Sequence, residues 1–196
     1  MIIVMKTYYI TGISGFLGFN IVKALEKQEC KIVGFILPND RNAKMFDNYK
    51  NVTLVEGNVL NKDDVLKFLT TNNTEENYLI HCAGKITTLK KGDDSVIKIN
   101  FGGTKQIVDV YNTLNFNKMI YISSVDALDE VKGNAPIVEQ SEYHLDLAPS
   151  IYSQSKIMSS NYIMQNVSNY IIIMPSAIFG PDDPLSSPIN KAINKI

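Results

Sequence analysis

The sequence has little of what disulfide-rich, metal-binding or nucleic-acid-binding proteins require. Its 196 residues contain no tryptophan, two histidines and two cysteines, Cys30 and Cys82. Two cysteines are too few for a disulfide framework or a cysteine zinc site, so we expect reduced thiols and no bound metal. Nineteen basic and twenty acidic side chains give a net charge of −1, which excludes the strong basic excess of a nucleic-acid-binding surface.

Long hydrophobic runs are also missing, and we expect no membrane partner. No stretch reaches the roughly 18 consecutive apolar residues that a transmembrane helix needs. The first five residues are apolar but have no basic flank or small-residue cleavage site, so we predict no signal peptide and a cytoplasmic location. Hydrophobic residues make up 45% and charged residues 20% of the chain, which is typical of a globular domain with a sizeable core.

What the sequence does contain is a regular alternation of short apolar runs and longer amphipathic stretches. The expected strands are 8–10, 32–37, 52–55, 78–83, 118–122 and 170–174. The expected helices are 16–28, 62–70, 95–114 and 152–167. Asn61 is placed to cap the second helix, and Gly102 and Gly103 form a weak point in the third. This alternation predicts an α/β fold, a parallel sheet with helices on both faces.

Three glycines at a spacing of three follow the first expected strand, in residues 11–18 (TGISGFLG). In dinucleotide-binding folds, the first such glycine makes a tight turn, the second lets a pyrophosphate approach and the third allows close helix packing. The helix that follows would present free N–H groups and its positive dipole end to the phosphates. The alternative is a glycine-rich turn that binds nothing, but the strand–loop–helix context favours dinucleotide binding.

This segment resembles the glycine motif of the extended short-chain dehydrogenase/reductase family, which includes NAD-dependent epimerases and dehydratases and dihydroflavonol-reductase-like enzymes. Five further segments are similar to family motifs in the same order. They are 80–84 (IHCAG), 100–104 (NFGGT), 121–124 (YISS), 152–156 (YSQSK) and 174–181 (MPSAIFGP). The resemblance covers nearly the whole chain and implies the N-terminal, nucleotide-binding portion of such an enzyme. Its expected fold is a doubly wound (Rossmann) parallel sheet with the strand order 3-2-1-4-5-6.

Tyr152 and Lys156 are the predicted proton-transfer pair. Four residues apart on an expected helix, they share one face, and a neighbouring ammonium lowers the pKa of a phenol toward a useful range. The resemblance implies that Tyr152 exchanges the proton of a substrate oxygen and that Lys156 also binds the nicotinamide ribose. It implies that Ser124, or the adjacent Ser123, hydrogen-bonds that oxygen, and that Asn100 positions a proton-relaying water. The alternatives without chemistry are an exposed helix pair and a strand-end turn.

The predicted cofactor contacts come from the ends of several strands. They are Gly12, Ser14, Gly15, Phe16, Leu17, Gly18, Asp40, Arg41, Asn58, Val59, Cys82, Ala83, Gly84, Ser123, Tyr152, Lys156 and Pro175. Asp40 suits the ribose of NAD, whereas Arg41 suits the 2′-phosphate of NADP. Both coenzymes stay open, with NADP slightly favoured. Asn58 stands where the family typically has an adenine-contacting aspartate.

Two polar residues near these motifs have simpler interpretations than catalysis. His81, at the end of the fourth expected strand, is interpreted as a packed histidine beside the cofactor loop and not as a base. Asp126 lies two residues after Ser124, where dehydratase relatives carry an acidic residue, and is interpreted as an ordinary loop carboxylate.

Members of the resembled family are considerably longer than this chain, and their C-terminal part supplies most of the substrate pocket. We therefore assign residues 1–180 to the NAD(P)-binding domain and residues 181–196 to the start of a substrate lobe that is largely absent. Apolar surface left uncovered in this way would favour self-association as a homodimer.

The predicted function is NAD(P)-dependent hydride transfer between the nicotinamide and an alcohol or ketone. Two alternatives stay open: an NAD-dependent sugar-nucleotide epimerase or dehydratase, and a non-catalytic NAD(P)-binding sensor. The HCAG and SSVDAL segments resemble dihydroflavonol reductases and hydroxysteroid dehydrogenases more than the sugar enzymes. Tyr152, Lys156 and Ser124 argue against a sensor, which has no need of them.

Overall fold

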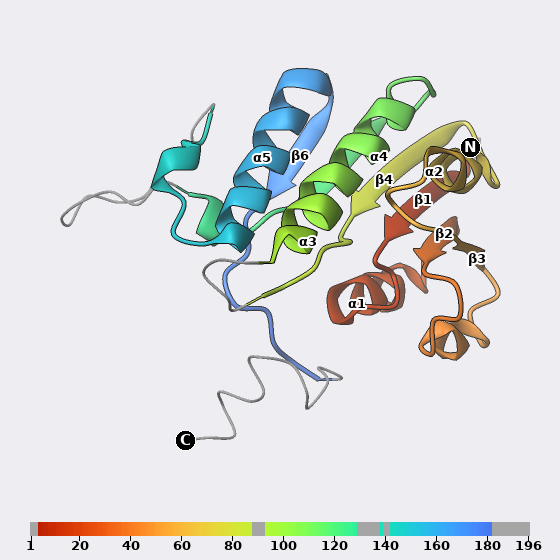
Figure 1. Ribbon diagram of the computed structural model, residues 1–196. Coiled ribbons are helices and arrows are strands. Elements are labelled where there is room, and N and C mark those ends of the chain that lie inside the picture. Colours follow the sequence, from red (N-terminus) through yellow and green to blue (C-terminus); the bar gives the residue numbers. More distant parts are fainter. Residues whose placement is uncertain (1–3, 88–92, 129–137, 139–141, 182–196) are drawn as a thin grey trace.

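Six parallel strands form a single sheet in the order β3-β2-β1-β4-β5-β6 (Figure 1). The computed structural model describes residues 4–87, 93–128, 138 and 142–181. The strands are β1 (Lys6–Thr11), β2 (Cys30–Ile36), β3 (Val52–Glu56), β4 (Glu76–His81), β5 (Lys118–Ile122) and β6 (Tyr170–Ile173). The predicted strand order is confirmed. Because the order reverses between β1 and β4, the segments that follow these two strands leave toward opposite faces of the sheet and open a crevice where such folds bind ligands.

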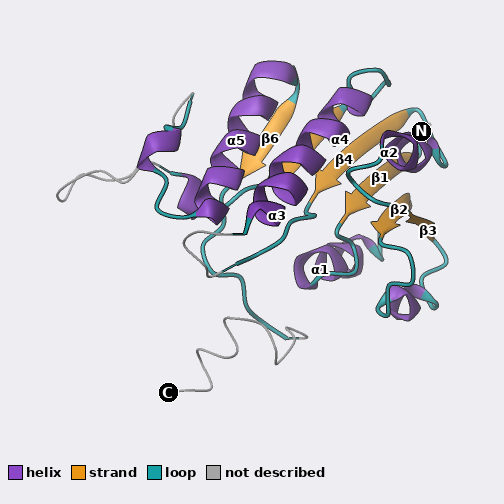
Figure 2. Ribbon diagram, in the orientation of Figure 1, coloured by secondary structure: helices purple, strands orange, loops and turns teal. Residues whose placement is uncertain are grey.

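Helices connect the strands and cover the sheet (Figure 2). They are α1 (Phe16–Leu25), α2 (Lys62–Thr70), α3 (Asp94–Ile97), the π-helix η2 (Lys98–Gly102), α4 (Gly103–Tyr111) and α5 (Ile151–Asn166). Three short 3₁₀ turns are η1 (Ala43–Phe46), η3 (Val125–Ala127) and η4 (Leu145–Leu147). Asn61 caps α2 as predicted, since its side chain accepts hydrogen bonds from the amides of Asp63 and Asp64.

The two largest of the three core clusters in the described residues lie on opposite faces of the sheet. Successive side chains of a strand point to opposite faces, so Tyr9 joins one cluster and its neighbour Ile10 joins the other. The first cluster packs under α2, α4 and α5, with Phe68 at its centre, and the second packs under α1 and η1, with Val22 fully buried. Burial on both faces explains the continuous apolar runs of the central strands.

The single long helix predicted for residues 95–114 is wrong in one respect. The structure divides it into α3, the π-helical turn η2 and α4. Asn100, at the centre of the π-turn, is buried and bonds to the backbone of Lys85, which holds the turn away from α-helical geometry. A Cβ atom on Gly103 would lie 2.8 Å from Cγ2 of Val59, so the glycine lets η2 and α4 approach that side chain closely.

The edge strand β6 differs from the other strands because three of its four residues are exposed. Ile171 and Ile173 are 43% and 45% exposed. The self-association that such a surface favours stays a prediction. Apart from Pro181, the predicted start of a substrate lobe, residues 181–196, lies outside the described residues. In the described part of the chain, no helix combines the length and the apolar character needed to cross a bilayer.

Candidate functional site

A cleft of about 620 Å³ opens at the carboxyl ends of the strands. Its walls come from the glycine loop and α1, the ends of β4 and β5, one face of α5 and the segment after β6. The lining residues are Gly12, Gly15, Phe16, Leu17, Gly18, Cys82, Gly84, Ile86, Ile122, Ser123, Ser124, Val125, Asp126, Tyr152, Lys156, Pro175, Ser176, Ala177 and Ile178. Twelve of the predicted site residues therefore meet in one cleft although they are scattered along the sequence.

The three loop glycines differ in what surrounds them. Gly12 has a φ of +67°, and a Cβ there would lie 2.9 Å from the Cα of Ala83. A Cβ on Gly18 would lie 2.3 Å from the carbonyl oxygen of Gly12. At Gly15 the nearest atom is that same oxygen at 3.3 Å, and the residue is exposed. The tight turn and the close helix packing are confirmed, and Gly15 leaves open the space that a phosphate would need.

The first turn of α1 supplies a place for an anion. Gly15 is the N-cap and contributes no side-chain cap, and the first N–H groups of a helix have no intrahelical acceptors. Phe16 and Leu17 line the cleft at this point. The positive end of the helix dipole therefore faces the cleft, an arrangement that suits a diphosphate.

The loop after β2 is fastened to the glycine loop through Asp40. One oxygen of its carboxylate accepts a hydrogen bond from the Ser14 hydroxyl at 2.6 Å, and the other accepts from the Asn42 amide at 2.9 Å. Asn42 returns a bond to the Ser14 carbonyl. Arg41 is exposed. The carboxylate, and not the guanidinium, is thus the charged group held against the phosphate-binding turn.

Tyr152 and Lys156 project from one face of α5 into the cleft. The Lys156 ammonium is buried, donates to the Ile122 carbonyl at 2.7 Å and lies 5.8 Å from the centre of the Tyr152 ring. It also lies 5.0 Å from the ring of Tyr121. A Cβ on Gly84 would be 3.7 Å from the ammonium nitrogen. The lysine is therefore fixed by the end of β5 and by two aromatic rings, with Gly84 leaving room beside it.

The pKa of Tyr152 reflects two opposing effects. Burial raises the pKa most strongly, while the Lys156 ammonium and a hydrogen bond with Ser124 lower it. The lysine acts in the predicted direction, but burial outweighs it, so the predicted net lowering is not seen. Burial also lowers the pKa of Lys156. The Cys82 thiol beside them stays protonated, because burial raises its pKa to about 12.

The two serines at the end of β5 have different surroundings. Ser124 lines the cleft, its oxygen accepts from the Asp126 amide at 3.2 Å, and its hydroxyl is hydrogen-bonded with Tyr152. Ser123 is paired with Ser160 of α5 at 2.9 Å. This difference favours Ser124 over Ser123 as a donor to a substrate. Asp126, interpreted from sequence as a loop carboxylate, also lines the cleft.

Asn100 lies behind the cleft and is occupied within the protein. Its amide oxygen accepts from the Lys85 N–H at 2.6 Å, and its amide nitrogen donates to the Lys85 carbonyl and to the Ser155 hydroxyl. These bonds make Asn100 a clamp between the loop after β4 and α5. Its predicted role in positioning a water stays a prediction.

Seven predicted residues do not line the cleft: Ser14, Asp40, Arg41, Asn58, Val59, Ala83 and Asn100. The exposed Asn58 uses its side-chain oxygen to accept from the Leu60 amide in the turn before α2. Val59 packs against Gly103. Ala83 donates its N–H to the Thr11 hydroxyl. Their contacts to a coenzyme stay predictions.

Sequence reasoning missed part of the cleft wall. Ile86 follows the fourth-strand motif, and Ser176, Ala177 and Ile178 lie inside the motif after β6. Nothing in their residue types indicates a site. Only the convergence of parallel strand ends at one edge of the sheet could have suggested them.

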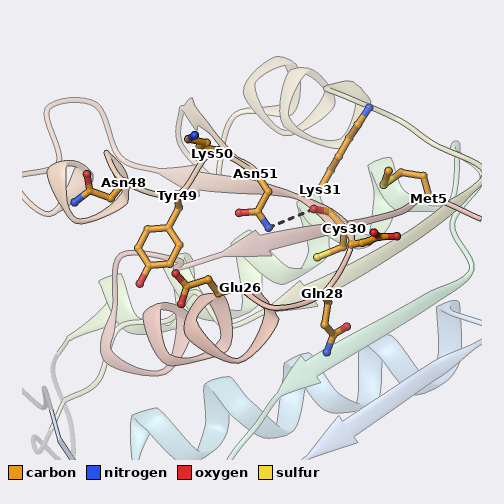
Figure 3. Close-up of a pocket in the computed structure, with 10 residues that line it drawn as sticks. Met5, Glu26, Gln28, Cys30, Lys31, Asn48, Tyr49, Lys50 and Asn51 are labelled. Carbon is orange, nitrogen blue, oxygen red and sulfur yellow. Dashed lines mark hydrogen bonds between the residues drawn. The ribbon is translucent and has the colours of Figure 1, made fainter. Parts of the chain in front are cut away.

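A second hollow of about 700 Å³ lies at the opposite, amino-terminal edge of the sheet (Figure 3). Its lining comes from the segment before β1 and from the turns that lead into β2 and β3. The residues are Met5, Glu26, Gln28, Glu29, Cys30, Lys31, Asn48, Tyr49, Lys50 and Asn51. The amide of Asn51 donates to the Cys30 carbonyl at 3.3 Å. The lining includes side chains of both charges among uncharged ones.

Comparison with known proteins agrees with this architecture. The model of the NAD dependent epimerase/dehydratase family matches residues 8–196. The chain is 26% identical to the 3β-hydroxysteroid dehydrogenase/Δ5→4-isomerase of monkeypox virus and 25% identical to a putative dihydroflavonol 4-reductase of Synechocystis. These alignments cover 93% and 95% of this chain and 55% and 53% of those proteins. The chain thus spans about half the length of these relatives.

Solved structures share the fold. The Bordetella bronchiseptica enzyme WbmH, determined in complex with NAD+, superposes with a TM-score of 0.74 at 21% identity, covering 97% of this chain and 62% of that one. The six-stranded order, the glycine loop and the family match agree with one another. The chain therefore belongs to the NAD dependent epimerase/dehydratase family.

Proposed function

We propose that the protein binds NAD in the cleft and takes part in hydride transfer between the nicotinamide and an alcohol or ketone. The observation that carries this proposal is the meeting of a glycine loop and helix N terminus with Tyr152, Lys156 and Ser124 in one cleft. Space for a diphosphate at Gly15 fits this coenzyme. A non-catalytic sensor would need the glycine loop and the helix N terminus, but it would not need Tyr152, Lys156 and Ser124.

Asp40 supports NAD over NADP. Its carboxylate is held at the glycine loop by Ser14 and the Asn42 amide. A carboxylate there can accept from a ribose hydroxyl but repels a 2′-phosphate. This argument reverses the slight sequence-based preference for NADP, which rested on Arg41.

Three side chains of the cleft have different roles in proton transfer to and from the substrate oxygen. Bound NAD would supply or accept the hydride. For reduction of a ketone, the Tyr152 phenol gives its proton to the substrate oxygen, and for oxidation its phenolate takes the proton back. Lys156 favours the phenolate by its charge. Ser124, which is hydrogen-bonded with Tyr152, would donate to the same substrate oxygen and fix its position.

The cleft wall favours an apolar alcohol or ketone. Ile86, Val125 and Ile178 line the cleft and are 67%, 40% and 36% exposed. The similarity to a viral hydroxysteroid dehydrogenase supports the same substrate class.

One observation favours the second candidate, a dehydratase. Asp126 lines the cleft two residues after Ser124 and raises the pKa of Tyr152 by its charge. A carboxylate beside the phenol can serve as a second acid in water elimination. Absorbance of the reduced nicotinamide separates the two functions, because an epimerase or dehydratase returns the hydride and shows no net change while product forms.

The coenzyme proposal is tested by calorimetric titration of NAD and NADP side by side. We expect the wild type to prefer NAD, and we expect Asp40→Asn to shift the affinity ratio toward NADP by about tenfold, or about 1.4 kcal/mol. Asp47→Asn, an exposed aspartate after η1, is the matched control. A ratio that changes with Arg41→Ala and not with Asp40→Asn would contradict the assignment.

A further inference from the structure

His81 is buried behind the cleft, and the proposed proton transfer does not use it. The side chain is 1% exposed at the end of β4 and stacks on Tyr121 with ring centres 5.5 Å apart. Its Nδ1 lies 2.6 Å from the hydroxyl of Thr11, and its Nε2 lies 3.0 Å from the hydroxyl of Thr104. The ring therefore bridges the last residue of β1 and the first turn of α4.

The surrounding partners set the direction of each hydrogen bond. Thr104 donates its one hydroxyl proton to the Asn100 carbonyl at 2.6 Å, so its oxygen must accept from His81, and Nε2 carries the ring proton. Burial lowers the pKa of His81 to about 3, so the ring is neutral and Nδ1 accepts from Thr11. The Thr11 oxygen in turn accepts from the Ala83 N–H at 3.1 Å.

The two ends of this chain of bonds lie at the two halves of the site. At one end, Thr11 immediately precedes Gly12, and Ala83 is the residue against which Gly12 packs. At the other end, the Asn100 side chain donates to the Ser155 hydroxyl at 2.9 Å, and Ser155 donates to the Tyr152 carbonyl at 2.7 Å. Buried hydrogen bonds of this kind hold groups in fixed geometry, because an unpaired buried polar group is costly.

We propose that His81 is a positioning residue: as the neutral Nε2–H tautomer, it joins Thr11 to Thr104 and thereby holds the glycine loop in register with α5. The proposal rests on the proposed function, since it concerns how the coenzyme site and Tyr152 are aligned. It assigns His81 no contact with substrate or coenzyme. The histidine acts through Asn100 and Ser155 on the backbone of Tyr152.

Variants of Thr104 test the helix end of the chain of bonds without changing a cleft residue. Thr104→Val removes the hydroxyl at nearly constant volume, and Thr104→Ser restores it. We expect Thr104→Val to lower kcat on the order of 10- to 100-fold, since small misplacements are costly in catalysis, and to change NAD affinity by less than about twofold. Thr104→Ser should recover most of the wild-type kcat.

Thr113→Val is the matched control. Thr113 also donates to a carbonyl of α4, that of Val110, but lies outside the chain of bonds. A kcat for Thr104→Val equal to that of Thr113→Val would overturn the proposal. A lower kcat with unchanged NAD affinity is the informative result, because a general loss of structure would lower both kcat and NAD affinity.

Nitrogen-15 NMR of the wild-type ring keeps the proposal testable even if Thr104→Val does not fold. We expect a protonated Nε2 and an unprotonated Nδ1. A ring protonated on Nδ1, or a charged ring near neutral pH, would overturn it. Failure of the wild type to bind NAD would instead refute the proposed function, and the ring tautomer would still be measured independently.

Discussion

Two hollows of similar volume lie at opposite edges of the same sheet, yet they differ in how they are built. The cleft at the carboxyl ends of the strands is lined by loop glycines, a helix N terminus, Tyr152 and a buried Lys156. The hollow at the amino ends is lined by side chains around Tyr49, including Glu26 and Lys50 (Figure 3). The first is about 620 Å³ and the second about 700 Å³.

The difference teaches that volume does not identify a site in this fold. Ligand binding requires a few fixed polar groups that converge on one space. In the cleft, the N-cap Gly15 offers no side chain to the first N–H groups of α1, so they can bind a ligand. The Lys156 ammonium is held there by the Ile122 carbonyl. In the other hollow, the side-chain amide of Asn51 donates to the carbonyl of Cys30 in the neighbouring strand β2. We therefore expect coenzyme and chemistry at the carboxyl edge alone.

The largest expected effect is on turnover. Tyr152→Phe removes the hydroxyl that takes the proton from the substrate oxygen during oxidation, so we expect kcat to fall about 10²- to 10⁴-fold while NAD affinity stays unchanged. Tyr49→Phe makes the same change in the other hollow and should leave kcat at the wild-type level. The measurement is steady-state formation of reduced nicotinamide with a 3β-hydroxysteroid as probe substrate. Full activity of Tyr152→Phe would refute the assigned role.

A smaller effect is expected on coenzyme affinity. Gly15→Ala places a methyl group where the diphosphate would lie, and its nearest protein atom would be 3.3 Å away. We expect NAD affinity to fall on the order of 100-fold with little change in melting temperature. In Gly102→Ala, the new methyl would meet Cδ2 of Leu60 at 3.5 Å, and affinity should be unchanged. Equal NAD affinities of Gly15→Ala and Gly102→Ala would contradict the placement of the diphosphate at Gly15.

The smallest expected effect is on the free energy of unfolding and comes from His81, which is buried behind the cleft. His81 stays neutral in the folded protein, where its pKa is about 3, but gains a proton below about pH 6.5 once unfolded. Its contribution is therefore complete above that pH and decreases as the pH falls. Between about pH 7 and about pH 5 the loss comes to about 2 kcal/mol.

Urea unfolding of the wild type and His81→Gln at both pH values measures this contribution. The variant lacks the titrating group, so its stability should fall less on acidification by that amount. A His81 ring that titrates near its ordinary pKa of 6.5 in the folded protein would contradict the prediction.

Features that depend on short-range sequence could be predicted well. The turn at Gly12 and the cap at Asn61 follow from local backbone chemistry. Tyr152 and Lys156 share a helix face because they are four residues apart. Each of these predictions needed only residues near one another in the chain.

Features that depend on long-range contacts could not be predicted. The π-turn at Asn100 exists because that side chain bonds to Lys85, fifteen positions away. The net rise in the pKa of Tyr152 comes from burial, which the sequence does not report. The proposed preference for NAD, which depends on Asp40 and not on Arg41, is based on a hydrogen bond that Asp40 accepts from Ser14 of another loop.

A crystal structure of the protein soaked with NAD tests the central claim most directly, because it shows which edge of the sheet holds the coenzyme. We predict the diphosphate against the first turn of α1 at Phe16 and Leu17, with the nicotinamide facing the Tyr152 hydroxyl. Coenzyme bound instead in the hollow beside Tyr49, or a carboxyl-edge cleft without coenzyme at saturating NAD, would contradict the account.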